Sequence, residues 1–171
     1  GDGLLYWHPS TALEDMAHEL GHIFTMNHSD LIYAGQSGGI NESFSGMTSK
    51  MMMALTAQKH SWFPNTWEYG LATTKVDGPL QGKPLWWLND PPRDGHSIDN
   101  ANNYIPGMNV HYSAGVFNKA FYLLSTMPGW SVTKDFALMV RANMEYWVPA
   151  STFAYAACGV IQEAHNRGED I

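Results

Sequence analysis

Hydrophobic residues return every three or four positions in five stretches of the chain, a spacing that is typical of amphipathic helices. The pattern predicts helices at about 11–25, from near 39 to 55, at 114–124, at 131–144 and at about 154–166. Alternation with a period of two residues, which is typical of half-buried strands, is scarce. The chain is therefore predicted to be mainly α-helical.

Local signals mark where some helices begin and where helical structure is interrupted. Thr11 and Glu14 have the spacing of a capping box, and Ser131 follows a break at 127–130 and can cap the next helix. Residues 60–110 hold most of the prolines and turn sequences such as NDPPRDG, which favour irregular structure. We therefore expect a helical domain with a long irregular central segment.

Composition and charge limit the classes of protein to which the chain can belong. Its 171 residues suit one domain or part of a larger protein, and 44% are hydrophobic, which suffices for a real core. The net charge is −7 and the nine lysines and arginines are scattered, which argues against nucleic acid as a partner. The apolar runs are too short to cross a bilayer, and we recognise no signal peptide. We expect no membrane partner, and a cytosolic protein or a processed part of an exported precursor.

The strongest chemical signal is the sequence HELGH at residues 18–22, inside the first predicted helix. Residues four apart on a helix lie on one face with Cβ atoms about 5–6 Å apart, so His18 and His22 can reach one zinc ion. Glu19 is turned away from His18 by about 100° and can face a water molecule whose proton it takes. The same pattern also arises by chance in helices that bind no metal.

A catalytic zinc site needs a third protein ligand, and two residues have suitable positions. His28 lies ten residues after His18, as in the metzincin pattern HExxHxxGxxH, but this chain has Thr25 where that pattern needs glycine for a sharp turn. Glu42, twenty residues after His22 in SGGINESFS, falls on the second predicted helix. If Glu42 is the ligand, His28 is expected to be a loop or surface histidine.

Four motifs follow one another along almost the whole chain, namely HELGH, LIYAGQSGGINESFS, NVHYSAGVFNKAFYLLS and ACGVIQEAHNR. Together they resemble the thermolysin-like zinc metallopeptidases and are most similar to the vibriolysin and pseudolysin branch. The resemblance implies that residues 1–171 form a single helical domain, the C-terminal lobe of the catalytic region, without the family's β-rich N-terminal lobe. It also implies a Zn²⁺ cofactor, a peptide or protein substrate and an exported, extracellular enzyme.

By position, the resemblance implies a metal centre and a general base. His18, His22 and Glu42 match the family's zinc ligands, and Glu19 matches the base that activates water. Asn41 matches a residue that supports the ligands from outside the metal centre.

The resemblance also implies which residues stabilise the oxyanion and line the cleft. Tyr33 and His111 match the pair that stabilises the tetrahedral oxyanion, for which a phenol and an imidazole are suitable donors. Asn109 stands where the family has an acidic partner for this histidine, and Trp86 where it has an arginine that binds the substrate carbonyl. Leu85 is expected to help line the substrate pocket.

Several other positions depart from the family's pattern. Gly46 replaces an aspartate that orients a zinc histidine, and the loss of such a partner typically costs about 10–100-fold in metal affinity or activity. Lys50 and Met53 replace carboxylates that bind calcium, so we expect no calcium there. Cys158, the only cysteine, matches a half-cystine whose partner is absent from this chain, so a free and buried thiol is expected.

The leading hypothesis is a zinc endopeptidase that prefers bulky apolar residues just after the cleaved bond. The departures at positions 46 and 86 and the missing lobe favour an alternative, a zinc-binding domain with little or no catalysis. A metzincin-like peptidase with His28 as third ligand is a further alternative. Methionines 51–53 cannot all face one core, so we also expect self-association through exposed apolar surface.

Overall fold

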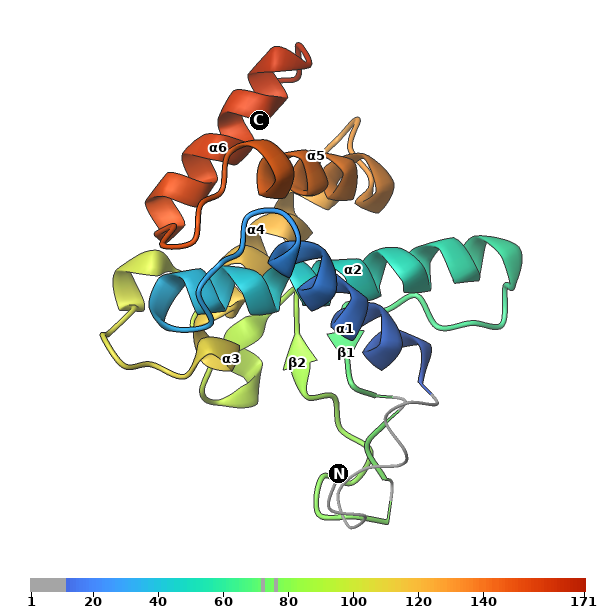
Figure 1. The fold of residues 1–171 in the computed structure, drawn as a ribbon. Coiled ribbons are helices and arrows are strands. Elements are labelled where there is room, and N and C mark those ends of the chain that lie inside the picture. Colours follow the sequence, from blue (N-terminus) through green and yellow to red (C-terminus); the bar gives the residue numbers. More distant parts are fainter. Residues whose placement is uncertain (1–11, 72, 76) are drawn as a thin grey trace.

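The computed structural model of the protein describes residues 12–71, 73–75 and 77–171 (Figure 1). The prediction of a mainly α-helical fold with an irregular central segment is confirmed. The described elements are α1 (Leu13–Met26), α2 (Gly35–Lys59), β1 (Glu68–Tyr69), β2 (Trp86–Trp87), the 3₁₀ helices η2 (Pro91–Asp94) and η3 (Ala101–Asn103), α3 (Val110–Ser113), α4 (Gly115–Ser125), α5 (Val132–Glu145) and α6 (Phe153–Asn166).

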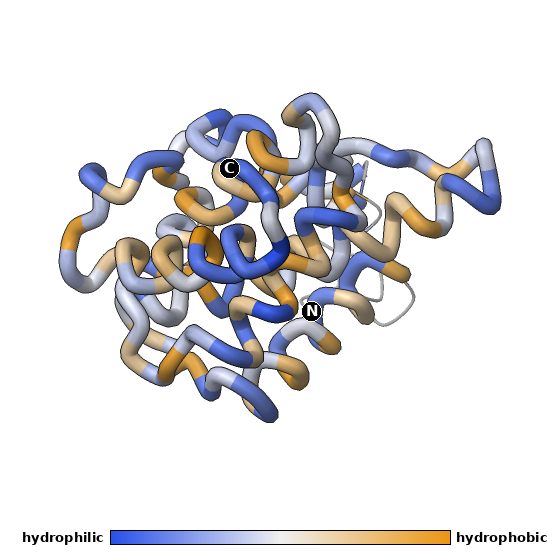
Figure 2. Tube along the Cα trace, turned by 90° about the horizontal axis from the view of Figure 1, so that it is seen from above, coloured by the Kyte–Doolittle hydropathy of each residue, from blue (hydrophilic) through white to orange (hydrophobic). Residues whose placement is uncertain are grey.

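Helix α2 is the central element, and the other described α-helices all contact it (Figure 1). Its residues Ile40, Phe44 and Met47 recur every three or four positions and are at most 1% exposed. Figure 2 shows hydrophobic residues alternating with hydrophilic ones along the helices, as expected for helices that bury one face. The main core joins α2 to side chains of the C-terminal helices, including Phe117, Phe121, Leu138, Trp147, Phe153 and Val160.

Helix α2 begins at Gly35 rather than near Gly39, because its first turns consist of small residues that give no apolar signal. A Cβ atom on Gly38 would lie only 2.4 Å from Cγ1 of Val110. One on Gly39 would lie 2.4 Å from Oγ of Ser113. Glycine is thus required where α3 rests on the backbone of α2, and this contact brings α3 to the start of α2.

The predicted helix caps have different outcomes. The Ser131 hydroxyl accepts a hydrogen bond from the backbone N–H of Lys134, so this cap is confirmed. Thr11, the first member of the predicted capping box, lies outside the described residues. The residue that precedes α1 is Ala12, whose side chain makes no cap.

Helix α1 turns small residues toward α2. A Cβ atom on Gly21 would lie 2.6 Å from Cα of Ser45, so the two helix backbones approach closely. Phe24 packs on Phe44 of α2, whereas five other apolar residues of α1 are between 36% and 64% exposed: Leu13, Met16, Leu20, Ile23 and Met26. In α2, by contrast, Met53 is buried and its two preceding methionines are half-buried.

Two short strands organise the central segment. β1 and β2 pair antiparallel, with Tyr69 opposite Trp86, and these side chains form a small second core with Leu88. The segment before β1 is fixed to α2 because the Lys50 ammonium donates to Asn65 Oδ1 at 2.6 Å and to the Thr66 carbonyl at 2.7 Å. The β1–β2 pair is therefore held against α2.

The expectation that Cys158 is buried is wrong, because its thiol is exposed on α6. The buried face of α6 passes through Ala156 and Val160, and Cys158 lies midway between them on the opposite side of the helix. None of the helices in the described part of the chain combines the length and the apolar character needed to span a membrane.

Candidate metal centre

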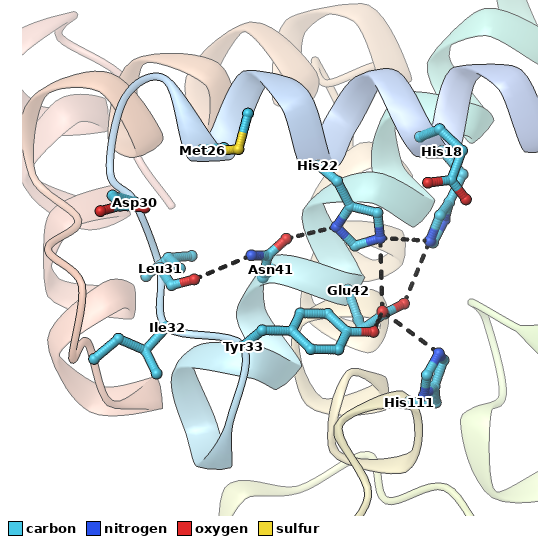
Figure 3. A pocket seen from close by; sticks show the side chains of 11 residues that line it. His18, His22, Met26, Asp30, Leu31, Ile32, Tyr33, Asn41, Glu42 and His111 are labelled. Atoms are coloured by element: carbon cyan, nitrogen blue, oxygen red, sulfur yellow. Dashed lines mark hydrogen bonds and ion pairs between the residues drawn. The ribbon is translucent and has the colours of Figure 1, made fainter.

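The close contact between α1 and α2 brings three metal-binding side chains together (Figure 3). His18 and His22 lie one turn apart on α1, and Glu42 projects from α2 toward both rings. His18 is 6% exposed and Glu42 only 1%. Among the described residues, these three form a group whose histidine nitrogens and carboxylate oxygen all lie within 4.8 Å of one another.

The separations within the group suit a tetrahedral ion. Nε2 of His18 lies 3.0 Å from Nε2 of His22 and 3.3 Å from Oε2 of Glu42. Nε2 of His22 lies 3.6 Å from Oε1 of Glu42. Ligand atoms bonded at ~2.1 Å to one tetrahedral zinc ion are roughly 3.4 Å apart, so the donor set fits this metal.

The charge of Glu42 also fits a cation. Burial by itself would raise the pKa of the Glu42 carboxyl, but hydrogen bonds from His18 and Tyr33, together with the charge of His111, outweigh it. The pKa therefore lies below its usual range and the group is ionised at neutral pH. A buried carboxylate is costly unless it is paired or coordinates a metal.

The two histidines differ in how their second nitrogen is used. Nδ1 of His22 lies 2.7 Å from Oδ1 of Asn41, whose Nδ2 donates to the Leu31 carbonyl at 3.2 Å (Figure 3). Nδ1 of His18 is buried and has no hydrogen-bond partner within the described ranges. Gly46, where an aspartate was expected from the resemblance, offers no side chain to it.

A cavity of about 690 Å³ opens beside these three side chains. Glu19 is exposed and lines this cavity. Tyr33 and His111 also line it, and both point at Glu42, because the Tyr33 hydroxyl donates to Oε1 and Nε2 of His111 lies 3.4 Å from the same atom (Figure 3). Burial, followed by the hydrogen bond to Glu42, raises the pKa of the Tyr33 phenol, which therefore stays protonated at neutral pH.

Asn109 holds His111 in place at the start of α3. Its Oδ1 accepts a hydrogen bond from the backbone N–H of His111 at 3.0 Å and lies 2.9 Å from Nδ1 of the ring. Trp86 is next to this ring, with the two ring centroids 5.8 Å apart. Leu85 does not line the cavity, and instead packs so tightly on Gly70 that a Cβ there would lie 2.6 Å from Leu85 Cγ.

The structure does not bring His28 to the metal-binding group. Its ring is exposed, stacks on Phe24 at 4.0 Å and places Nδ1 2.8 Å from the Phe24 carbonyl oxygen. Helix α1 continues through Thr25 to Met26, so the sharp turn that would redirect His28 does not form.

Several residues around the site were not found from the sequence. Met26, Asp30 and Ile32 line the cavity, and Tyr69 stacks beside His18. Tyr69 lies far from α1 in the sequence and belongs to a two-residue strand, so no local pattern indicates this contact.

Comparison with known proteins identifies relatives along the whole chain. Residues 29–170 match the family model described as thermolysin metallopeptidase, alpha-helical domain. The chain is 42% identical over 171 residues to a zinc metalloproteinase of Legionella pneumophila, and 39% identical over 171 residues to a neutral protease of Vibrio proteolyticus. These matches cover 100% of this chain but 30% and 26% of those relatives.

A solved structure has the same fold. The precursor of protealysin, a metalloproteinase from Serratia proteamaculans, superposes with a TM-score of 0.81 at 24% identity. The superposition covers 99% of this chain and 56% of that one.

Proposed function

The chain belongs to the thermolysin family of metallopeptidases, and from this membership we propose that it is the zinc-binding helical domain of an endopeptidase. The observation that carries the proposal is the convergence of His18, His22 and Glu42 on one point between α1 and α2. The ionised Glu42 needs a matching positive charge, and a divalent cation held by the three side chains would supply it.

Zinc bound at this point would act as a Lewis acid that polarises a carbonyl oxygen and lowers the pKa of a water molecule to about 7. Glu19 is the base in our proposal, because it follows a ligand directly, lines the same cavity and is exposed. Its carboxylate takes a proton from the attacking water and gives it to the departing amine. A general base has to lie within hydrogen-bond reach of the proton that it removes, with a carboxylate oxygen available to accept it.

Tyr33 and His111 are the groups that stabilise the oxyanion in our proposal. The Tyr33 hydroxyl and Nε2 of His111 converge on one oxygen of Glu42, so the two donors already point at the same small region. A substrate carbonyl oxygen in this region would accept from both as negative charge develops on it. Asn109 supports the second donor because it holds the other ring nitrogen of His111.

The substrate proposal is a peptide or protein with a bulky apolar residue just after the cleaved bond. Apolar side chains of Met26, Leu31 and Ile32 line the cavity beside the proposed catalytic groups and support this preference. Leu85 lies outside the cavity lining and takes no part in this proposal.

A zinc-binding domain with little catalysis is the second candidate. It is favoured by the buried His18 Nδ1, which lacks a hydrogen-bond partner in the described part of the chain, and by an indole at position 86, which cannot bind a carbonyl as an arginine would. A metzincin-like centre with His28 is disfavoured, because the Nδ1 atom of His28 contacts its own helix backbone.

Further expectations follow from the same resemblance. We propose that no calcium binds near Lys50, because its ammonium already lies among Asn65 and Thr66, and a second cation there would be repelled. We also propose that the protein acts outside the cell. The exposed apolar face of α1 supports self-association of the isolated chain.

Zinc content and peptide cleavage test the proposed function. The purified protein is expected to hold a stoichiometric amount of zinc and to cleave a peptide with leucine after the scissile bond, and a chelator should stop cleavage. Glu19→Gln should keep the zinc and lower the cleavage rate by about 10²–10⁴-fold. Zinc without cleavage would favour the second candidate, and absence of stoichiometric zinc would refute both.

A further inference from the structure

The two histidines of the metal centre are held in place by different interactions. A metal-binding histidine usually donates its second ring N–H to an oxygen, and this bond fixes the orientation of the ring. Asn41 supplies that oxygen to His22, whereas Nδ1 of His18 is buried and finds no partner among residues 12–71, 73–75 and 77–171. Its other ring nitrogen, Nε2, lies 3.3 Å from Oε2 of Glu42 and 3.0 Å from Nε2 of His22, so packing has to supply the support that Nδ1 does not receive.

Two aromatic rings of the β1–β2 hairpin pack around His18. The centroid of its imidazole lies 5.1 Å from that of Tyr69, with 33° between the planes, and 5.6 Å from that of Trp86, with 53°. The two aromatic rings stack on each other at 4.9 Å. Tyr69 and Trp86 are opposite residues of the paired strands, so their side chains leave the hairpin on the same face. We call these two rings the aromatic slot.

The aromatic slot is fixed to both helices that carry the metal centre. The Tyr69 hydroxyl donates to Oδ1 of Asp15 at 3.1 Å, and Asp15 lies three residues before His18 on α1. Lys50 of α2 binds the Thr66 carbonyl just before β1. Both rings of the slot are at most 9% exposed, so they cannot rotate freely into solvent. The slot is thus rigid relative to His18.

Position 46 of α2 borders the indole of the aromatic slot. Gly46 lies one turn after Glu42 on α2, on the same face of that helix. A Cβ atom there would lie 3.7 Å from Cζ3 and 3.9 Å from Cε3 of Trp86, which is ordinary contact. The nearest atom to such a Cβ is Oδ1 of Asn118 at 3.6 Å, so a methyl group fits here, and a longer side chain enters a space bordered by this amide and the indole.

We propose that Tyr69 and Trp86 are positioning residues that orient His18 for zinc by packing their rings against its imidazole, in place of a hydrogen bond to its Nδ1. Gly46 is part of this arrangement, because it places no side chain beside the indole. This inference rests on the proposed function, because it takes His18 as a zinc ligand. The slot acts on the affinity for the metal and touches no reacting atom.

The zinc affinity of Trp86 variants tests the proposal. Affinity is measured on the metal-free protein by competition with a chromophoric chelator, and the visible spectrum of cobalt bound in place of zinc reports the ligand geometry. Trp86→Ala should weaken zinc binding about 10-fold or more and alter the cobalt spectrum, since outer supports of metal ligands have effects of this size. Trp86→Phe keeps a stacking ring and should stay within about 3-fold of the wild type. Trp62→Ala is the matched control, because this tryptophan is 78% exposed, and it should change neither reading.

Gly46→Asp provides a second test that does not depend on folding of the alanine variant. We expect the carboxylate to disturb the packing of the neighbouring indole and to weaken zinc binding at least about 3-fold, and combining this change with Trp86→Phe should recover part of the loss. Unchanged affinity in Trp86→Ala, or tighter binding in Gly46→Asp, would overturn the proposal. If the wild type itself binds no zinc, the proposed function fails instead, so the two failures are distinguishable.

Discussion

Replacing Asp135 by asparagine should make the variant progressively more stable relative to the wild type as the pH rises. Asp135 lies on α5, is 0% exposed and accepts a hydrogen bond at Oδ2 from the Ser125 hydroxyl at 2.8 Å. Its Oδ1 has no partner in the described part of the chain. Burial raises the pKa of the Asp135 carboxyl to about 8, although hydrogen bonds from Ser125 oppose the shift.

The size of the effect follows from the two pKa values of Asp135. The unfolded chain has a pKa near 3.9, so between about pH 4 and pH 8 the folded protein binds one proton more than the unfolded protein. The stability due to this group is complete below the unfolded pKa and is lost as the pH rises through the folded pKa. Each pH unit in this window costs about 1.4 kcal/mol, so the free energy of unfolding falls by roughly 3–4 kcal/mol from pH 5 to pH 8.

Urea unfolding of wild type and Asp135→Asn at pH 5, 6, 7 and 8 measures this effect. The metal-free proteins are used, because zinc binding has its own pH dependence. The amide keeps the volume and the acceptor for Ser125 but does not titrate, and all other groups are common to both proteins. From pH 5 to pH 8, the free energy of unfolding of the variant should rise steadily relative to that of the wild type and exceed it at pH 8. If the difference in free energy of unfolding between the two proteins stays constant to within about 0.5 kcal/mol across this range, the Asp135 carboxyl is not buried in its protonated form.

Three further predictions concern the metal centre and its support. Glu42→Ala should abolish stoichiometric zinc binding while His28→Ala leaves it intact, as measured by elemental analysis, and the reverse result would reinstate the metzincin-like centre. Asn41→Ala should weaken zinc binding about 10–100-fold in chelator competition, because His22 loses the oxygen that orients it, and unchanged affinity would exclude that role. Lys50→Met should lower the free energy of unfolding by about 1–3 kcal/mol in urea, because the Thr66 carbonyl loses a buried donor, and Lys59→Met on the exposed end of α2 serves as its neutral control.

The helices were predictable wherever one of their faces carries large apolar residues. Phe44 and Met47 mark α2 in this way, and Phe121 marks α4. The first turns of α2 were missed, because close contact with α3 demands glycine there, and small residues have no periodic hydrophobic signal. The burial of Cys158 was also predicted wrongly, since its match to a half-cystine does not determine which side of α6 the thiol takes in this chain.

In the candidate site, contacts between residues close in the sequence were predictable, and contacts between distant segments were not. His18 and His22 meet because helical spacing fixes them. The residues alone left Glu42 and His28 as candidates for the third ligand, with Thr25 arguing against His28, and the resemblance then favoured Glu42. The structure distinguishes between these two candidate ligands, because Glu42 faces the rings of His18 and His22 and His28 does not. The aromatic slot depends on pairing between strands that are far from α1 in the sequence. Such a contact has no signature along the chain.

The two candidate functions differ less than the sequence suggests, because affinity for zinc and catalysis depend on opposite sides of the same centre. On the buried side, Nδ1 of His18 has no hydrogen-bond partner among the described residues and its ring packs against the aromatic slot, which bears on how tightly a metal is held. On the open side, Glu19, Tyr33 and His111 line one cavity, and the ring of His111 lies 5.8 Å from that of Trp86, measured between centroids. Weak metal binding would lower the fraction of active protein without altering the turnover of each loaded centre. A low activity measured at trace zinc therefore says nothing about the catalytic groups, whereas activity at saturating zinc reports on them directly.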